Sequence, residues 1–184
     1  MSDMQIIGLD QINWLRRNRY RRTMDFMMKH ISPSDRITDL GTPNPLSELM
    51  KLNGLIVTNT GGEDFDTEYG KIADYEGDVT TSFEVFEHLL APFNILREIK
   101  SPKLIASVPL RLWFANAYWN EKSEWDRHYH EFEPRQFDWL LEKSGWRITD
   151  RESWTAPIKA VGLRPLLRLF TKRYYIVCCE RMPR

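Results

Sequence analysis

Residues 78–90 read DVTTSFEVFEHLL and carry more information about the fold than any other part of the chain. The first half, residues 78–83, predicts a strand, because β-branched and aromatic residues suit a pleated, half-buried surface. Two carboxylates and an imidazole, Glu84, Glu87 and His88, follow at once. Ligands of open α/β sheets bind beyond the carboxyl ends of the strands, so polar residues placed there are candidates for a site.

Strand and helix patterns alternate on both sides of this stretch, which predicts an α/β fold. Parallel neighbours need a crossover long enough to hold a helix, so the alternation indicates a mostly parallel sheet with helices on both faces. The adjacent Cys178 and Cys179 fall in the last, strongly apolar strand and are expected to face opposite sides as reduced thiols. We expect strands at 36–41, 55–58, 78–83, 103–109, from 146 and at 173–180, and helices at 10–30, 45–51, 89–100 and 135–144.

The composition predicts one folded, cytoplasmic domain over residues 1–184. Because 26 Lys and Arg balance 26 Asp and Glu, no global field draws the chain toward nucleic acid or an anionic membrane. No apolar run approaches the ~20 residues that cross a bilayer, and no basic start followed by an apolar core marks the N-terminus. Residues 1–33 are expected to form a helical segment. The aromatic-rich residues 110–132 are expected to form a substrate lid, with a core or dimer interface as the alternative.

Four short motifs stand in the order in which class I S-adenosylmethionine-dependent methyltransferases carry them. Residues 78–90 resemble the fourth-strand motif of that family, which leads into the loop beside the cofactor. Residues 37–41 resemble the family's first strand, and residues 103–109, ending in a proline, resemble its fifth. Residues 128–146 are similar to a stretch of the small-molecule branch. The resemblance covers roughly residues 17–181 and implies a Rossmann-like, seven-stranded, mostly parallel sheet with helices on both faces.

The resemblance implies methyl transfer from S-adenosylmethionine to oxygen or nitrogen of a small-molecule acceptor. Positioning is expected to supply most of the rate, and a hydroxyl acceptor also needs a general base. His88 is the first candidate for that base, since a neutral imidazole near pH 7 accepts a proton. His128 and His130, two positions apart, would share one face of an extended segment and reach a substrate or a metal. Without a third ligand at convincing spacing, no metal site is predicted.

Cofactor contacts are implied at the ends of the first, second and fourth family strands. The family places an acidic residue after its second strand, where a carboxylate accepts hydrogen bonds from both ribose hydroxyls, and alignment puts Gly61 at that position. Glu63 or Asp64 are the candidates to replace it, with Asn59 as a weaker one. The implied cofactor residues are Asp39, Gly41, Thr42, Asn59, Glu63, Asp64, Ser82, Phe83 and Glu84, with Asp74 and Tyr75 beside adenine.

The loop after the first strand departs from the family, and this departure motivates a second hypothesis. The family usually has D-h-G-x-G-x-G there, whereas this chain keeps Asp39 and Gly41 but has Pro43 and Pro45 where the other glycines would stand. Proline has no N–H to donate, so the loop is a poorer anion cradle. The alternative is therefore a methyltransferase-like domain that has lost the cofactor and acts as a binding module.

A third hypothesis is an RNA-directed methyltransferase or RNA-binding protein. Clustered arginines can bind the phosphates of a nucleic acid. Because five arginines in seven positions cannot all face one side of a helix, nucleic acid is not the expected partner. A nicotinamide dehydrogenase is disfavoured because no G-x-G-x-x-G follows the first strand. The acceptor and the oligomeric state are not predicted. The arginines are Arg16, Arg17, Arg19, Arg21 and Arg22, with Arg164, Arg168, Lys172 and Arg173 later in the chain.

Overall fold

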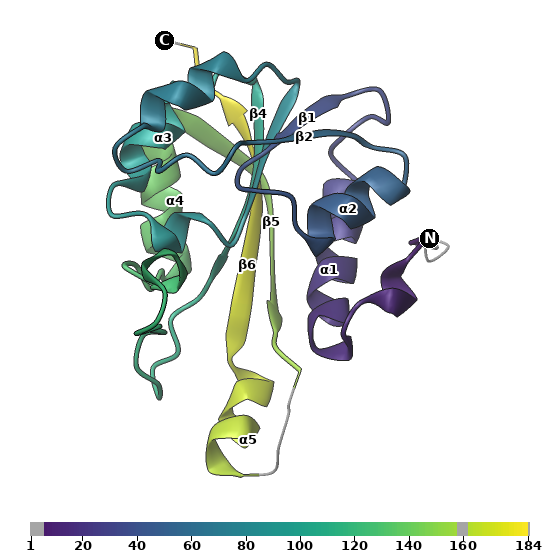
Figure 1. The fold of residues 1–184 in the computed structure, drawn as a ribbon. Helices are drawn as coiled ribbons and strands as arrows, with labels where there is room; N and C mark the ends of the chain where they lie inside the picture. Colours follow the sequence, from purple (N-terminus) through teal and green to yellow (C-terminus); the bar gives the residue numbers. More distant parts are fainter. Residues whose placement is uncertain (1–5, 158–161, 184) are drawn as a thin grey trace.

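A six-stranded sheet runs through the centre of the molecule (Figure 1). The computed structural model describes residues 6–157 and 162–183, and for residues 163–165 the backbone only. The strand order is β2-β1-β3-β4-β6-β5; the first four strands are parallel, and β6 runs antiparallel to both its neighbours. The strands are β1 (Arg36–Asp39), β2 (Ile56–Asn59), β3 (Val79–Phe83), β4 (Lys103–Pro109), β5 (Trp146–Thr155) and β6 (Lys172–Arg181).

Helices cover both faces of the sheet, as the sequence predicted. Figure 1 shows α1 and α2 on one side, α3 and α4 on the other, and α5 beyond one end of the β5 and β6 ribbon. No described helix is long and apolar enough to cross a membrane. The α-helices are α1 (Trp14–Met27), α2 (Pro45–Leu52), α3 (Pro92–Glu98), α4 (Pro134–Lys143) and α5 (Leu163–Phe170); short 3₁₀ turns occur at Leu9–Gln11, Tyr69–Asp74, Phe86–His88 and Glu124–Asp126.

The expectation of seven strands was wrong for the described part of the chain, which has six. Residues 60–78, between β2 and β3, contain the 3₁₀ turn Tyr69–Asp74 and no strand, although a parallel crossover there could hold another strand and helix if it were longer. Nineteen residues rich in glycine and acids cannot hold both elements and offer no apolar run for a strand. As a result, β2 is a border strand of the sheet and pairs with β1 alone.

Two hydrophobic cores lie on the two faces of the sheet. Alternation along β4 sends Leu104 and Ala106 into the core under α3 and α4, and Ile105 into the core under α1 and α2. Cys179 and Cys178 divide in the same way, and both are buried free thiols, which confirms the predicted opposite facing. Burial raises the pKa of both cysteines, so neither offers a thiolate near neutral pH.

The parallel strands bring their carboxyl ends to one edge of the sheet. β1 and β3 pair in register up to Asp39 and Thr81, and β3 and β4 pair up to Phe83 and Ser107. Glu84, the residue after β3, has a φ of 59° and is the only non-glycine residue with positive φ among those described. Such a conformation is costly and persists where the surroundings fix it, so the bend that redirects the chain after β3 is a built feature of this edge.

Candidate active site

A small cavity of about 230 Å³ opens at this edge, against α1. Its charged lining has two cations and two anions, which suits a ligand that carries both signs, such as the amino and carboxylate groups of an amino acid. Arg19 donates to Glu84 (Nη1 to Oε2, 3.1 Å), and the Ser107 hydroxyl donates to the other Glu84 oxygen (3.0 Å). The residues that line the cavity include Arg16, Arg19, Asp39, Asn44, Phe83 and Glu84.

Asp39 ends β1 as a buried carboxylate. It accepts hydrogen bonds from the Thr81 hydroxyl (2.6 Å) and from the Asn59 amide nitrogen (3.0 Å). Burial raises the pKa of Asp39 to about 6, against the opposing effect of these two hydrogen bonds. A carboxylate held ionised in such a place is ready to pair with a cationic ligand group.

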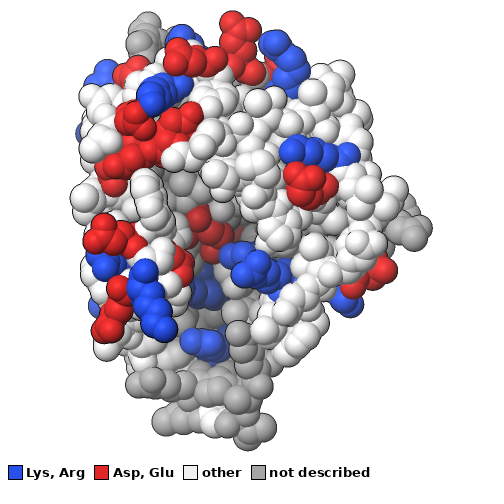
Figure 2. Space-filling model, in the orientation of Figure 1, with Lys and Arg blue, Asp and Glu red and all other residues white. Residues whose placement is uncertain are grey.

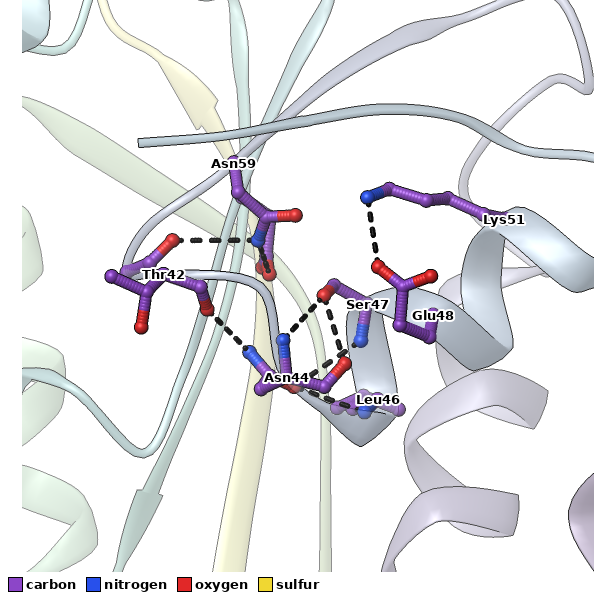
Figure 3. A network of polar contacts seen from close by, with 9 residues as sticks. Thr42, Asn44, Leu46, Ser47, Glu48, Lys51 and Asn59 are labelled. Atoms are coloured by element: carbon purple, nitrogen blue, oxygen red, sulfur yellow. Dashed lines mark hydrogen bonds and ion pairs between the residues drawn. The ribbon is translucent and has the colours of Figure 1, made fainter. Parts of the chain in front are cut away.

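The loop after β1 is fastened to the end of β2 and to its own helix (Figure 3). Gly41 donates its N–H to the Thr60 hydroxyl (2.8 Å), and the Asn59 amide lies 3.4 Å from the Gly41 carbonyl oxygen. Asn44 caps α2 by accepting from the N–H groups of Leu46 and Ser47. The first donors of α2 are therefore already used, so the helix N-terminus is not a free anion site.

The carboxylate of Glu63 turns back toward Gly61. A Cβ placed on Gly61 would be 3.2 Å from Glu63 Oε1, so the Glu63 carboxylate lies where a side chain at position 61 would extend. The Tyr75 hydroxyl donates to Glu63 Oε1 (2.6 Å) and accepts from the Gly61 N–H (3.0 Å). The second carboxylate oxygen, Oε2, is buried without a partner. Gly62, with a φ of 90°, makes the reversal and packs against Thr42, whose Cγ2 atom a Cβ would approach to 3.0 Å.

Asp64 and Asp74 have other surroundings. The Asp64 carboxylate accepts from the Asp66 N–H (3.1 Å) and the Thr67 hydroxyl (3.1 Å), which closes a local turn. Asp74 is exposed at the end of its 3₁₀ turn. Of the sequence candidates at and after the end of β2, Asn59 contacts Asp39 and Gly41, and Glu63 contacts Tyr75 beside Gly61.

A second cavity, of about 890 Å³, adjoins the first, and the two share Arg16 and Arg19. Figure 2 shows the hollowed face with basic and acidic side chains inside it. Tyr118 and Trp119 of the aromatic segment line this cavity, whereas Trp113 and Trp125 are more than two-thirds exposed. The cavity also has Glu131, Arg168 and Arg173 in its wall.

The 3₁₀ turn after β3 and the end of the aromatic segment bring Glu87, His88 and His128 together. The N–H groups of Tyr129 and His130 both donate to the Glu87 carbonyl oxygen (2.8 and 3.2 Å), which holds the two segments side by side. The His88 and His128 rings pack edge to face, with centroids 4.9 Å apart. Burial, followed by the negative charge of Glu84, raises the pKa of Glu87 well above its usual range, and burial lowers the pKa of His88.

His130 does not join this cluster. Its Nε2 atom lies 3.2 Å from the Leu90 carbonyl oxygen, and its half-buried ring stacks on Phe132. His128 and His130 would share a face only in an extended segment. Because consecutive N–H groups bond to one carbonyl of Glu87, the backbone turns instead of extending, and only His128 points inward.

Arg16 and Arg19 line the cavities, although the sequence did not indicate them as site residues for a small ligand. They were expected to belong to a basic cluster, but both line the two cavities, three positions apart on the same helical face. Arg17 instead donates to the carbonyl oxygens of Asp10 and Ile12, so the N-terminal arginines do not form one surface. The side chain of Arg164 lies outside the described residues.

Ser82, one of the predicted cofactor residues, has a buried hydroxyl without a hydrogen-bond partner directly before Phe83.

Comparison with known proteins gives the fold. No family model and no curated protein matches the sequence. Among solved structures, the 1,6-didemethyltoxoflavin-N1-methyltransferase of Burkholderia thailandensis, with bound S-adenosylhomocysteine, is 15% identical with a TM-score of 0.61, over 89% of this chain and 78% of that one. An S-adenosylmethionine-dependent methyltransferase from Archaeoglobus fulgidus is 15% identical with a TM-score of 0.59, over 90% and 94%.

A third similar structure, the [4+2]-cyclase SpnF, is 11% identical with a TM-score of 0.56, over 89% of this chain and 80% of that one. At such identities the comparison bears on architecture, and one scaffold serves several reactions. The resemblance indicated by the motifs is thus confirmed at the level of the fold. The chain has the α/β fold of the class I S-adenosylmethionine-dependent methyltransferases.

Proposed function

We propose that this protein binds S-adenosylmethionine and transfers its methyl group to oxygen or nitrogen of a small acceptor. The observation that carries the proposal is Glu63. In a fold that leaves Gly61 at the ribose-binding position, its carboxylate fills the space of the absent side chain and keeps one oxygen without a partner. A buried, unpartnered carboxylate oxygen is expensive, so a hydroxyl donor from a ligand would stabilise it.

The remaining residues of this edge suit the rest of the cofactor. Asp39 and Glu84 would face the ammonium group of the methionine part, and Arg16 its carboxylate, because these residues line the 230 Å³ cavity. Tyr75 would lie beside the adenosine part. When bound, the cofactor supplies an electrophilic methyl group on a sulfonium.

The larger cavity supports a small acceptor. About 890 Å³ falls within the ~300–1,000 Å³ of ligand pockets in general. Arg16 and Arg168 have no ion-pair partner among the described residues, whereas Arg19 pairs with Glu84 and Arg173 with Glu131. The uncompensated positive charge favours an acceptor with a carboxylate or phosphate group. Tyr118 and Trp119 would cover it and exclude water, as proposed for the aromatic segment.

The proton of a hydroxyl acceptor would leave through the cluster of Glu87, His88 and His128. His88 Nδ1 lies 3.0 Å from the Arg127 carbonyl oxygen, which only accepts, so Nδ1 carries the proton and Nε2 of the neutral ring presents a lone pair. His88 therefore remains the first proposed site of proton transfer, while His130 has no part in it.

Glu63→Gln is expected to weaken S-adenosylhomocysteine binding about 10–100-fold, since a hydrogen bond to a charged group is worth ~1.5–3 kcal/mol. Calorimetric titration of the wild type and the variant measures this. Glu68→Gln is the matched control, because Glu68 is an acid of the same segment that pairs with Lys71. Its affinity should equal that of the wild type.

Two outcomes decide against parts of the proposal. If Asp64→Asn lost affinity for S-adenosylhomocysteine and Glu63→Gln did not, Asp64 and not Glu63 would bind the ribose hydroxyls. Absence of wild-type binding at millimolar ligand would reject the methyltransferase function and favour the binding module suggested by Pro43 and Pro45.

A further inference from the structure

We propose that Glu87, His88 and His128 form a binding site for a divalent transition-metal cation, with zinc as the best match. One ligand atom from each residue lies within 4.8 Å of the other two. The set comprises two imidazoles and one carboxylate, which is the ligand set of several catalytic zinc sites and leaves a coordination position open. The inference concerns the cation alone and does not depend on methyl transfer.

The second contacts of both histidines are those of metal ligands. The His88 Nδ1–H donates to the Arg127 carbonyl (3.0 Å), and the His128 Nδ1–H donates to Glu131 Oε1 (3.1 Å). Each ring is therefore held in the tautomer that leaves Nε2 with its lone pair. A carbonyl or carboxylate behind the ring is the usual support of a metal-bound histidine, because it orients the ring and raises its basicity.

The surroundings of Glu87 favour a bound cation between these side chains. It is 1% exposed, and its Oε2 atom has no hydrogen-bond partner. Its other oxygen, Oε1, lies 3.7 Å from Nε2 of His88, which is beyond hydrogen-bond distance. A buried carboxyl oxygen without a partner is unfavourable, and a cation between Glu87 and His88 would bind both side chains.

The ligand atoms lie farther apart than they would around a tetrahedral ion, so the side chains would rotate inward on binding. Ligands at 2.0–2.1 Å from zinc lie about 3.3 Å apart, compared with 3.7 Å between Glu87 Oε1 and His88 Nε2 and separations of up to 4.8 Å within the cluster. Imidazole nitrogen favours Zn²⁺ and Fe²⁺ over Mg²⁺, which prefers oxygen. Both cysteines are buried in the cores of the sheet, so they do not compete.

The site adjoins the larger cavity, because His128 bonds to Glu131 and its ring centroid is 5.1 Å from that of Tyr118, both in the cavity wall. If the proposed function holds, an acceptor hydroxyl bound to the cation would lose its proton more readily, and the cation, with His88 Nε2 as its ligand, would take over the activation assigned above to His88. The metal would then select hydroxyl-bearing acceptors.

The test is titration of the chelator-treated protein with Zn²⁺ by calorimetry, and with Co²⁺ as a spectroscopic probe. One equivalent should bind with micromolar or tighter affinity, with the d–d absorption of a four- or five-coordinate ion. His128→Ala and Glu87→Gln should each weaken binding at least tenfold. His130→Ala is the matched control and should leave affinity unchanged, and Mg²⁺ should not compete.

Three results would overturn the proposal: no binding of Zn²⁺ or Co²⁺, equal loss in His130→Ala, or unchanged affinity in both ligand variants. Thermal unfolding identifies a variant that fails to fold, and His88→Gln then serves as the second ligand variant. Titration without S-adenosylmethionine separates this result from the cofactor experiment. Cofactor binding with no metal binding would reject the metal site alone, and the reverse would reject the methyltransferase alone.

Discussion

Asp39→Asn is expected to raise the free energy of unfolding by about 3 kcal/mol at pH 8. The folded-state pKa of Asp39 is about 6, above the ordinary 3.8, because the carboxyl is buried. The folded state therefore holds the proton more tightly than the unfolded state, and the contribution of Asp39 to stability falls as pH rises from about 4 to 6. Each pKa unit corresponds to 1.36 kcal/mol, so the full penalty of the charge applies above pH 6.

The asparagine fits the same contacts. Its carbonyl oxygen can still accept from Thr81, and rotation of the Asn59 amide would offer its Oδ1 atom, which now has no partner, to the new N–H₂ group. Urea unfolding at two pH values measures the effect. The gain over wild type should shrink to about 1 kcal/mol at pH 4.5, where the wild-type carboxyl is largely protonated when folded.

Asp74→Asn, a change at an exposed carboxylate, should show no such pH-dependent gain. A gain from Asp39→Asn that is the same at pH 4.5 and pH 8 would contradict the burial of a charge. The stabilised variant should at the same time lose cofactor affinity, because it gives up a negative charge in the 230 Å³ cavity. Binding sites often contain residues that lower the stability of the fold, and the buried charge of Asp39 would be such a case.

Phe137→Ala is expected to lower the free energy of unfolding by about 3–5 kcal/mol, the usual range for removal of a buried aromatic ring. Phe137 of α4 is fully buried, and its ring centroid lies 5.2 Å from Phe132, 6.1 Å from Phe86 and 6.4 Å from Tyr175. Since small domains are stable by only ~5–15 kcal/mol, the loss would be severe.

The same substitution reaches the histidine cluster. Phe86 precedes Glu87 in its 3₁₀ turn, and Phe132 follows the segment that carries His128. The ring of Phe137 packs against both phenylalanines and so supports both segments of the cluster. Chemical denaturation gives the stability. Trp139→Ala in the same helix is the control, because Trp139 is 51% exposed and contacts Arg135 at the surface. A loss below 1 kcal/mol for Phe137→Ala would show that this core is loosely packed.

Much of the fold was predictable from local chemistry. Asn44 before Pro45 marked the start of α2, and the structure confirms both the cap and the first helical position. The helix α5 was not predicted, since Pro165 lies inside a segment of only eight residues. Proline in the first turn of a helix is tolerated, but spacing alone does not reveal that a helix begins two residues earlier.

The site was predictable only in part. The position of His88 after β3 followed from the motif, but its meeting with His128 depends on a turn of the backbone that periodicity does not encode. The return of Glu63 over Gly61 requires the positive φ of Gly62. The sequence placed Glu87 among the polar candidates after the strand, but its burial and its unpartnered oxygen are properties of packing and could not be predicted.

The two outer strands of the sheet differ in a way that bears on aggregation. Exposed strand edges can template pairing with other chains, and proteins limit this with short strands, charges or bulges. At one border β2 has four residues. At the other, β5 has ten residues, with a register shift between Ile148 and Asp150 and charged Arg147, Arg151 and Glu152 along it. Replacing these charges with apolar residues would leave a long, regular edge, and the protein would then associate through intermolecular strands at high concentration.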